Sequence, residues 1–151
     1  MPVMWRVYRA KHGPGLDGVG GMFSDGRWHS RGARVVYFGA SAAIVVLERL
    51  AHTDPPLLPD DLRLGRFDFT GTVEVAKVEE ILTLPPHWVQ EEVATRRAGD
   101  RWRSELSSCL LTVPSAILPE EANFVFNPLH SEAKHLRLVS ERPFQFDARL
   151  I

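Results

Sequence analysis

Cysteine, lysine and net charge are all scarce in this chain of 151 residues. The single cysteine, Cys109, excludes an internal disulfide and is typical of a protein kept in a reducing compartment. The formal net charge is −1, so the chain lacks the basic excess that binding to a nucleic-acid backbone normally requires. We therefore expect neither internal cross-links nor direct contact with nucleic acid.

Long apolar runs and metal motifs are also missing. The longest apolar run, Ala-Ala-Ile-Val-Val-Leu, is far too short to span a bilayer, and the N-terminus lacks the apolar region of a signal peptide. No cysteine pair is present, and His130 and His135 are not spaced to share one helical face. We expect a soluble, cytoplasmic protein with no membrane association and no bound metal.

Arginine supplies 15 of the 18 basic residues, and the other three are lysines. The planar fork of arginine suits phosphate and carboxylate groups, so the bias favours an anionic ligand. A codon preference for arginine explains the same bias, and composition alone leaves both readings open.

Strands and helices follow one another without a regular β-α-β rhythm, which predicts a single α+β domain over residues 1–151. A glycine-rich loop is expected over 11–27. The apolar patterns predict strands at 5–9, 34–38, 63–69, 72–78, 109–118 and 144–150, and helices at 41–52 and 89–98. Residues 119–136 mix turn signals with helix signals.

The predicted helix at 41–52 carries its polar side chains in one narrow sector. Ser41 is a plausible N-cap, and the proline pair at 55–56 ends the helix. Glu48 and His52 are four residues apart and therefore neighbours on that sector. The sector is either a solvated face or the wall of a pocket, and the pattern alone does not decide between them.

Two short segments resemble motifs of well-known enzyme classes, but the sequence around each of them does not fit the motif. The segment Gly-Pro-Gly-Leu-Asp-Gly at 13–18 matches a dinucleotide fingerprint, but no helix follows it. Ser115 lies in Val-Pro-Ser-Ala-Ile, which is not the turn of a hydrolase nucleophile. Neither a Rossmann site nor a serine hydrolase is expected.

A set of short fragments, taken in order, resembles the RES-domain family over nearly the whole chain, from about Trp5 to Leu150. The family takes its name from an arginine, a glutamate and a serine, which match Arg27, Glu48 and Ser115. The fragments are Gly-Arg-Trp at 26–28, Gly-Ala-Arg-Val-Val-Tyr at 32–37, Leu-Glu at 47–48, Pro-Ser at 114–115 and Asn-Pro-x-His at 127–130. His29 departs from the family, which more usually has asparagine there; it keeps a donor and an acceptor.

The resemblance implies a fold, an activity and a partner. It implies an ADP-ribosyltransferase-like core of two curved mixed sheets around an NAD cleft, with flanking helices. It also implies a toxin of a type II toxin–antitoxin pair that cleaves the nicotinamide–ribose bond of NAD⁺, which is consumed as substrate and is not a resident cofactor. The implied partner is an antitoxin of the Xre helix-turn-helix type, bound to a homodimer of toxins within a larger complex.

The chemistry of NAD⁺ assigns expected roles to the matching residues. The catalytic set is Glu48, Arg27, Ser115 and His52: Glu48 faces the ribose cation, Arg27 grips pyrophosphate, Ser115 orients the substrate, and His52 positions water or phosphate. Tyr37 stacks on nicotinamide, a planar cation suited to an aromatic face. Further expected substrate contacts are Trp28, Arg6, Asn123 and His130.

Three functions stay open at this point. The acceptor for ADP-ribose is water, phosphate or a side chain of a target protein, so a mono-ADP-ribosyltransferase is an alternative to an NAD⁺-depleting enzyme. A catalytically silent binding partner of a helix-turn-helix regulator is the alternative from another class.

Overall fold

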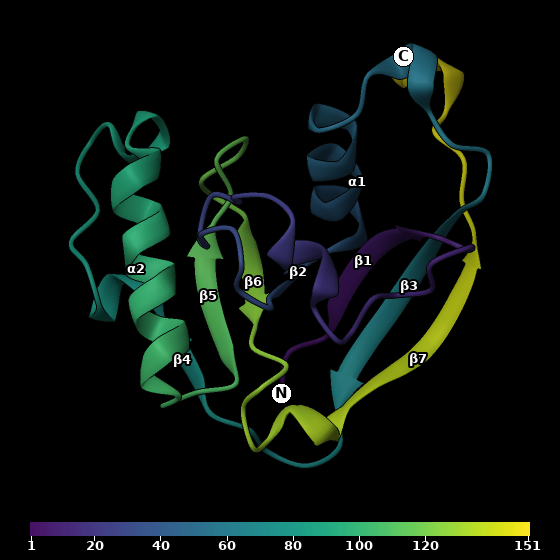
Figure 1. Ribbon diagram of the computed structural model, residues 1–151. Helices are drawn as coiled ribbons and strands as arrows, with labels where there is room; N and C mark the ends of the chain where they lie inside the picture. Colours follow the sequence, from purple (N-terminus) through teal and green to yellow (C-terminus); the bar gives the residue numbers. More distant parts are fainter.

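Seven strands form one mixed sheet in the computed structural model, which describes residues 1–151 (Figure 1). Their order across the sheet is β4-β5-β6-β2-β1-β3-β7, and every neighbouring pair is antiparallel except β4 and β5. The strands are β1 (Met4–Arg9), β2 (Val36–Gly39), β3 (Leu62–Phe69), β4 (Val75–Lys77), β5 (Leu110–Pro114), β6 (Ala122–Phe126) and β7 (Leu136–Pro143). The helices are α1 (Ala42–Ala51) and α2 (Glu92–Glu105).

The sheet is divided where β1 meets β2. Those two strands share only one paired position, Trp5 with Gly39, whereas β1 and β3 pair over six positions. The side chain of Arg6 on β1 bridges to β2 at this division. Its Nη1 donates to the Tyr37 carbonyl across 3.0 Å, and its Nε donates to the Pro14 carbonyl across 2.9 Å. Burial, followed by the charge of Arg49, lowers the pKa of Arg6 to about 10.

The largest apolar core joins the two halves on one face of the sheet. Phe38 of β2 packs edge-on against Phe67 of β3 with ring centroids 5.0 Å apart, so each half contributes to the same cluster. The expected α+β class is confirmed, and the two expected sheets are the two halves of this one sheet.

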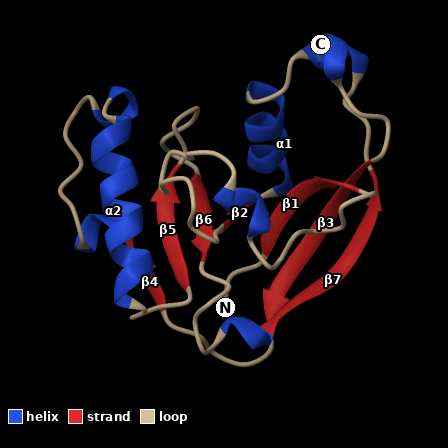
Figure 2. Cartoon of the chain, viewed as in Figure 1, coloured by secondary structure: helices blue, strands red, loops and turns tan.

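Both helices pack on the opposite face (Figure 2). Val45 of α1 packs with Val7 and Leu64, while Trp102 of α2 packs with Leu111, Val113 and Val125 in a separate cluster. Figure 1 shows α2 beside β5 and α1 toward β1, with β6 and β2 between the two helices. Neither helix is long and apolar enough to cross a membrane.

Two expectations for the second half of the chain are wrong. Residues 119–136 contain the strand β6, which pairs with both β2 and β5. Residues 144–150 are not a strand: the last strand is β7, which ends at Pro143, and a short 3₁₀ turn covers Ala148–Leu150. The alternation that predicted a strand there has another cause: Phe144 and Phe146 pack edge to face against the Val7 cluster. The pairing with β3 stops at Phe144, whose N–H donates to the Leu62 carbonyl across 2.9 Å.

Candidate active site

Glu48 projects from the helix α1, whose position is set at both ends. Ser41 caps the first turn, with its Oγ accepting the Ile44 N–H across 3.1 Å. His52 closes the last turn, where its Nδ1 lies 2.7 Å from the Glu48 carbonyl oxygen, so that nitrogen must donate. The apolar side of α1 is buried on the sheet, and Glu48 itself is half-buried.

The Glu48 carboxylate is held on one oxygen by two neutral donors. Ser115 Oγ donates to Oε1 across 2.7 Å, and Asn123 Nδ2 donates to the same Oε1 across 2.9 Å. The carboxylate forms no ion pair, and Oε2 has no hydrogen-bond partner within the chain. A negative charge is thus fixed in place without being neutralised by a neighbouring cation.

Ser115 is fully buried and serves the backbone as well as Glu48. It lies one residue beyond Pro114, where β5 ends, and its Oγ accepts the N–H groups of Ile117 and Leu118 across 3.1 and 3.2 Å. Asn123 stands on β6 and is paired in the sheet with Val113 and with Gly39. The sheet register therefore places both donors on the face that carries the helices.

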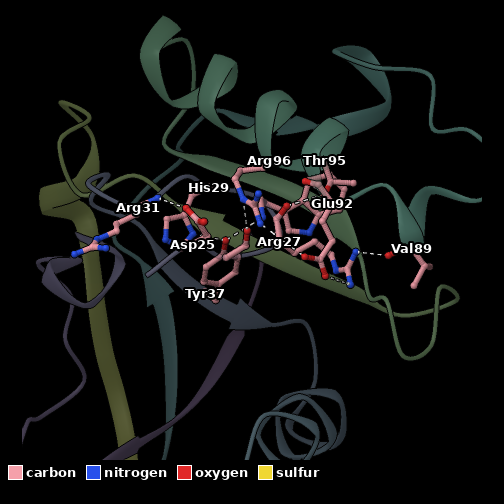
Figure 3. A network of polar contacts seen from close by, with 11 residues as sticks. Asp25, Arg27, His29, Arg31, Tyr37, Val89, Glu92, Thr95 and Arg96 are labelled. Carbon is pink, nitrogen blue, oxygen red and sulfur yellow. Dashed lines mark hydrogen bonds and ion pairs between the residues drawn. The ribbon is translucent and has the colours of Figure 1, made fainter. Parts of the chain in front are cut away.

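Arg27 lies in a loop that docks against the start of α2 (Figure 3). Its Nη1 donates to the Val89 carbonyl across 2.9 Å, and its Nη2 lies 3.4 Å from Oε1 of Glu92. The guanidinium carbon is 5.9 Å from the centre of the Trp88 ring. Two of the five N–H groups of this arginine are thereby used, and the other three have no hydrogen-bond partner within the chain.

The backbone of the same loop is fastened to α2. Thr95 Oγ1 donates to the Arg27 carbonyl across 2.7 Å, and Arg96 Nε donates to the Gly26 carbonyl across 3.2 Å. The helix carries glycine at position 99 because a Cβ there would overlap the Trp28 carbonyl oxygen. The Trp28 side chain is only 3% exposed and packs on Trp88, so it anchors the loop in the core and is not an accessible ligand surface.

Tyr37 lies on β2, on the same face of the sheet as Asn123 of the next strand. Its hydroxyl points into the loop, where it accepts the Trp28 N–H across 3.2 Å and lies 2.7 Å from Nδ1 of His29. Burial raises the pKa of the Tyr37 phenol above its ordinary value. Tyr37 as a whole is half-buried and packs against the Trp28 and Trp102 cluster, so the residue is not closed off from solvent.

The remaining predicted site residues are spread over three places. His52 is exposed at the end of α1, one turn beyond Glu48. Arg6 is engaged with two backbone carbonyls at the division of the sheet. His130 lines a separate hollow of about 480 Å³ that borders Phe126, on the opposite face of the sheet from Asn123.

The structure therefore brings Glu48, Ser115 and Asn123 into contact and places Tyr37 on the same face of the sheet. Arg27 is linked to this group through the next residue, whose N–H binds the Tyr37 hydroxyl. The contact of Arg27 with Glu92 was missed, since nothing local in the sequence signals that the loop docks on α2. The contact of His29 with Tyr37 was missed because the irregular loop that folds back on β2 carries no periodic pattern. No group of three or more side chains in the chain is arranged to hold a metal ion.

The chain is thus an α+β domain with two features that can be compared with known folds. Its single sheet is divided between β1 and β2, and the helix packed across the division carries a glutamate that forms no ion pair. The same fold occurs in the crystal structure of the M. tuberculosis MbcT–MbcA toxin–antitoxin complex, with a TM-score of 0.68 and 16% identity over 95% of this chain and 84% of that chain. The chain belongs to the RES domain family, whose model matches residues 3–147.

Relatives of known name match the chain from end to end. A protein of Pseudomonas putida named Toxin Res is 37% identical, covering 98% of this chain and 99% of that protein. A protein of Sphingobium named Prs ADP-ribosylating toxin is 32% identical, covering 97% of this chain and 95% of that protein. The chain is therefore a RES-domain protein of the toxin type.

Proposed function

We propose that this chain is a toxin that consumes NAD⁺ by breaking the bond between nicotinamide and ribose. The observation that carries the proposal is the Glu48 carboxylate, which Ser115 and Asn123 hold on one oxygen while no cation neutralises it. A carboxylate fixed in this way suits a reaction in which positive charge develops on the substrate. The relatives named as toxins support the biological side of the proposal.

The reaction needs a carboxylate more than it needs a general acid. Nicotinamide leaves with the electron pair of the carbon–nitrogen bond and departs as a neutral ring, so nothing has to protonate it. The ribose carbon passes through an oxocarbenium-like state, as in glycoside cleavage. In hydrolysis, water then adds its hydroxyl to that carbon and releases one proton; in phosphorolysis, a phosphate oxygen takes the same place.

The other residues divide between substrate contacts and the frame of the site. Arg27, held by Val89 and Glu92 through two N–H groups, offers its remaining donors to pyrophosphate. Tyr37 offers its aromatic ring to nicotinamide. His52, exposed one turn beyond Glu48, is placed to position water or phosphate. Arg6 already donates to two backbone carbonyls at the division of the sheet, so it is the weaker candidate for a substrate contact.

An antitoxin follows from this activity, because an enzyme that depletes cytoplasmic NAD⁺ harms the cell that makes it. The solved structure with the same fold is that of a toxin–antitoxin complex. We propose a partner of the Xre helix-turn-helix type, bound to a homodimer of this chain.

Transfer of ADP-ribose to a protein is the second candidate, and the Sphingobium relative favours it, because that relative is named an ADP-ribosylating toxin. The same carboxylate serves this reaction, since the bond that breaks is the same. Only the acceptor differs: a protein side chain takes the place of water or phosphate.

Nicotinamide release from NAD⁺ tests the proposal and separates the alternatives. Purified protein is incubated with NAD⁺ in buffer, with inorganic phosphate, and with a cell extract as a source of acceptor proteins, and Glu48→Gln serves as the matched inactive variant. Nicotinamide release in buffer indicates hydrolysis, and nicotinamide release only with phosphate indicates phosphorolysis. When the NAD⁺ carries a label in its ADP-ribose part, a labelled protein in the extract indicates transfer. No release under any of the three conditions overturns the proposal and favours a silent binding partner.

A further inference from the structure

His29 has both ring nitrogens engaged, although it is not among the residues expected to act on the substrate. It is 4% exposed. Its Nε2 lies 3.1 Å from the Gly21 carbonyl oxygen and 3.0 Å from the Ser24 carbonyl oxygen, and its Nδ1 lies 2.7 Å from the Tyr37 hydroxyl oxygen. A histidine that only filled space would not need three polar partners.

The partners determine the direction of each hydrogen bond. Carbonyl oxygens can only accept, so Nε2 must carry the hydrogen. In the neutral ring the other nitrogen is then a bare acceptor, and the Tyr37 hydroxyl must donate to Nδ1. The same hydroxyl oxygen accepts the Trp28 N–H across 3.2 Å, so its proton and one lone pair are both committed inside the loop.

The ring of Tyr37 is what remains for a ligand, because its hydroxyl is turned inward and tied. We infer that His29 is a positioning residue that accepts the phenolic proton of Tyr37 and so fixes the aromatic surface presented to the nicotinamide group; the inference rests on the proposed function. An aromatic face held in one orientation binds a planar cation without first losing ring freedom.

Gly26 provides the space for this hydrogen bond. A Cβ at position 26 would stand 2.5 Å from His29 Nδ1 and 2.6 Å from the Tyr37 hydroxyl oxygen, so no larger residue fits over the pair. The backbone of Gly26 also donates to the His29 carbonyl across 3.0 Å. The glycine before Arg27 therefore packs directly over the His29–Tyr37 contact.

Two amide substitutions separate the two sides of the His29 ring. In His29→Asn the side-chain amide reaches about as far as Nδ1, so the acceptor for Tyr37 is kept and the bonds to the Gly21 and Ser24 carbonyls are lost. In His29→Gln the amide reaches about as far as Nε2, so the bonds to the carbonyls are kept and the acceptor for Tyr37 is lost. The pair forms a matched test, and the exposed His12→Gln is the control for histidine replacement.

Steady-state nicotinamide release with varied NAD⁺ is the first measurement. We expect H29Q to raise KM by about tenfold with a smaller change in kcat, because the ring is misplaced while the chemistry at Glu48 is untouched. H29N is expected to keep KM close to that of the unaltered protein, and H12Q to match it throughout. The reverse order, with H29N impaired and H29Q normal, or equal behaviour of the two variants, overturns the inference.

Nitrogen-15 NMR of the unaltered protein supplies a readout that does not depend on activity. The His29 signals are identified by sequential resonance assignment of the unaltered protein and are measured at a pH where the ring is neutral. A ring with hydrogen on Nε2 and a bare Nδ1 supports the inference, and hydrogen on Nδ1 overturns it even if both variants unfold. A protein with the expected ring state that releases no nicotinamide refutes the proposed function but leaves the anchoring of Tyr37 intact.

Discussion

Ser115 donates its hydroxyl proton to Oε1 of Glu48 across 2.7 Å and so ties the end of β5 to the side of α1. The same oxygen of Ser115 accepts two backbone N–H groups from the turn that follows. One buried side chain thus holds both the carboxylate and the turn beside it, and its loss affects activity and stability together.

Glu48→Gln removes the negative charge while keeping an oxygen that Ser115 and Asn123 can still bind. We expect kcat and kcat/KM to fall together by about 10²–10³ with KM nearly unchanged, by analogy with loss of one transition-state electrostatic group. Steady-state nicotinamide release measures this, and a melting curve checks that the fold is kept. A variant with the turnover of the unaltered protein would remove Glu48 from the mechanism.

Ser115→Ala and Asn123→Ala differ in what they leave unpaired. Asn123 donates only to Glu48, so its loss should reduce turnover with little change in stability. Ser115→Ala also leaves the N–H groups of Ile117 and Leu118 without a partner, which should cost about 1–3 kcal/mol in addition. Chemical denaturation of the two variants side by side tests the difference, and equal free energies of unfolding would contradict it.

Arg27→Lys should weaken NAD⁺ binding without unfolding the protein. Lysine is a point charge and cannot span Val89, Glu92 and a phosphate at once. The partner Glu92 is largely exposed, so the lost ion pair itself should cost less than about 1 kcal/mol. Calorimetric titration with NAD⁺ measures the loss, and an unchanged affinity would mean that this loop does not bind the substrate.

Gly99→Ala tests the docking of the Arg27 loop on α2. The added methyl group overlaps the Trp28 carbonyl, so the loop or the helix must shift at a cost of about 1–3 kcal/mol. Gly20→Ala is the matched control, because a Cβ there meets nothing within 4 Å. Thermal unfolding of both variants decides the matter: equal melting temperatures would show that the contact is not close.

The two tyrosines should ionise at a higher pH than free tyrosine does. Burial, followed by the hydrogen bond to Glu141, raises the pKa of Tyr8 to about 12, and burial raises the pKa of Tyr37 as well. The folded state therefore favours the neutral phenols, and this stabilisation is complete below about pH 10 and is lost as the pH rises toward 12. Absorbance at alkaline pH measures it, with Tyr8→Phe leaving Tyr37 as the single phenol; titration of both at the free-tyrosine value in the folded protein would contradict it.

Local sequence patterns predicted a helix or strand correctly where the residues next to it in sequence were enough to show which of its sides is buried. The helix α1 is an example, since Ser41 caps it as expected and its apolar residues lie on the sheet. The strand β6 was missed because its short apolar stretch stands between Glu120-Glu121 and Asn127-Pro128, which are turn and helix signals. The strand β7 was missed because it is largely exposed and an irregularity opposite Arg66 and Phe67 interrupts its alternation.

The candidate site was predictable only in part for a similar reason. The family pattern points to Glu48, Ser115 and Arg27, but not to the second use of Ser115 in holding a turn. The partners of Arg27 arise where a loop meets a helix about 65 residues away along the chain, and local periodicity carries no information about that meeting. The contact of His29 with Tyr37 spans only eight residues, but it depends on how the glycine-rich loop folds back on β2, which has no periodic pattern either.

The junction of β1 and β2 has a single paired position, so it is a seam between two hydrogen-bonded units of the sheet, β4-β5-β6-β2 and β1-β3-β7. We expect amide exchange to reveal opening at this seam, because few backbone hydrogen bonds have to break there. Glu48 crosses the seam, because α1 packs on β1 and β2 while its carboxylate is held from β6 and from the end of β5. A substrate that drew Ser115 and Asn123 away from Glu48 would release one of the ties between the units, so occupancy of the site would register as a change in amide exchange far from the ligand.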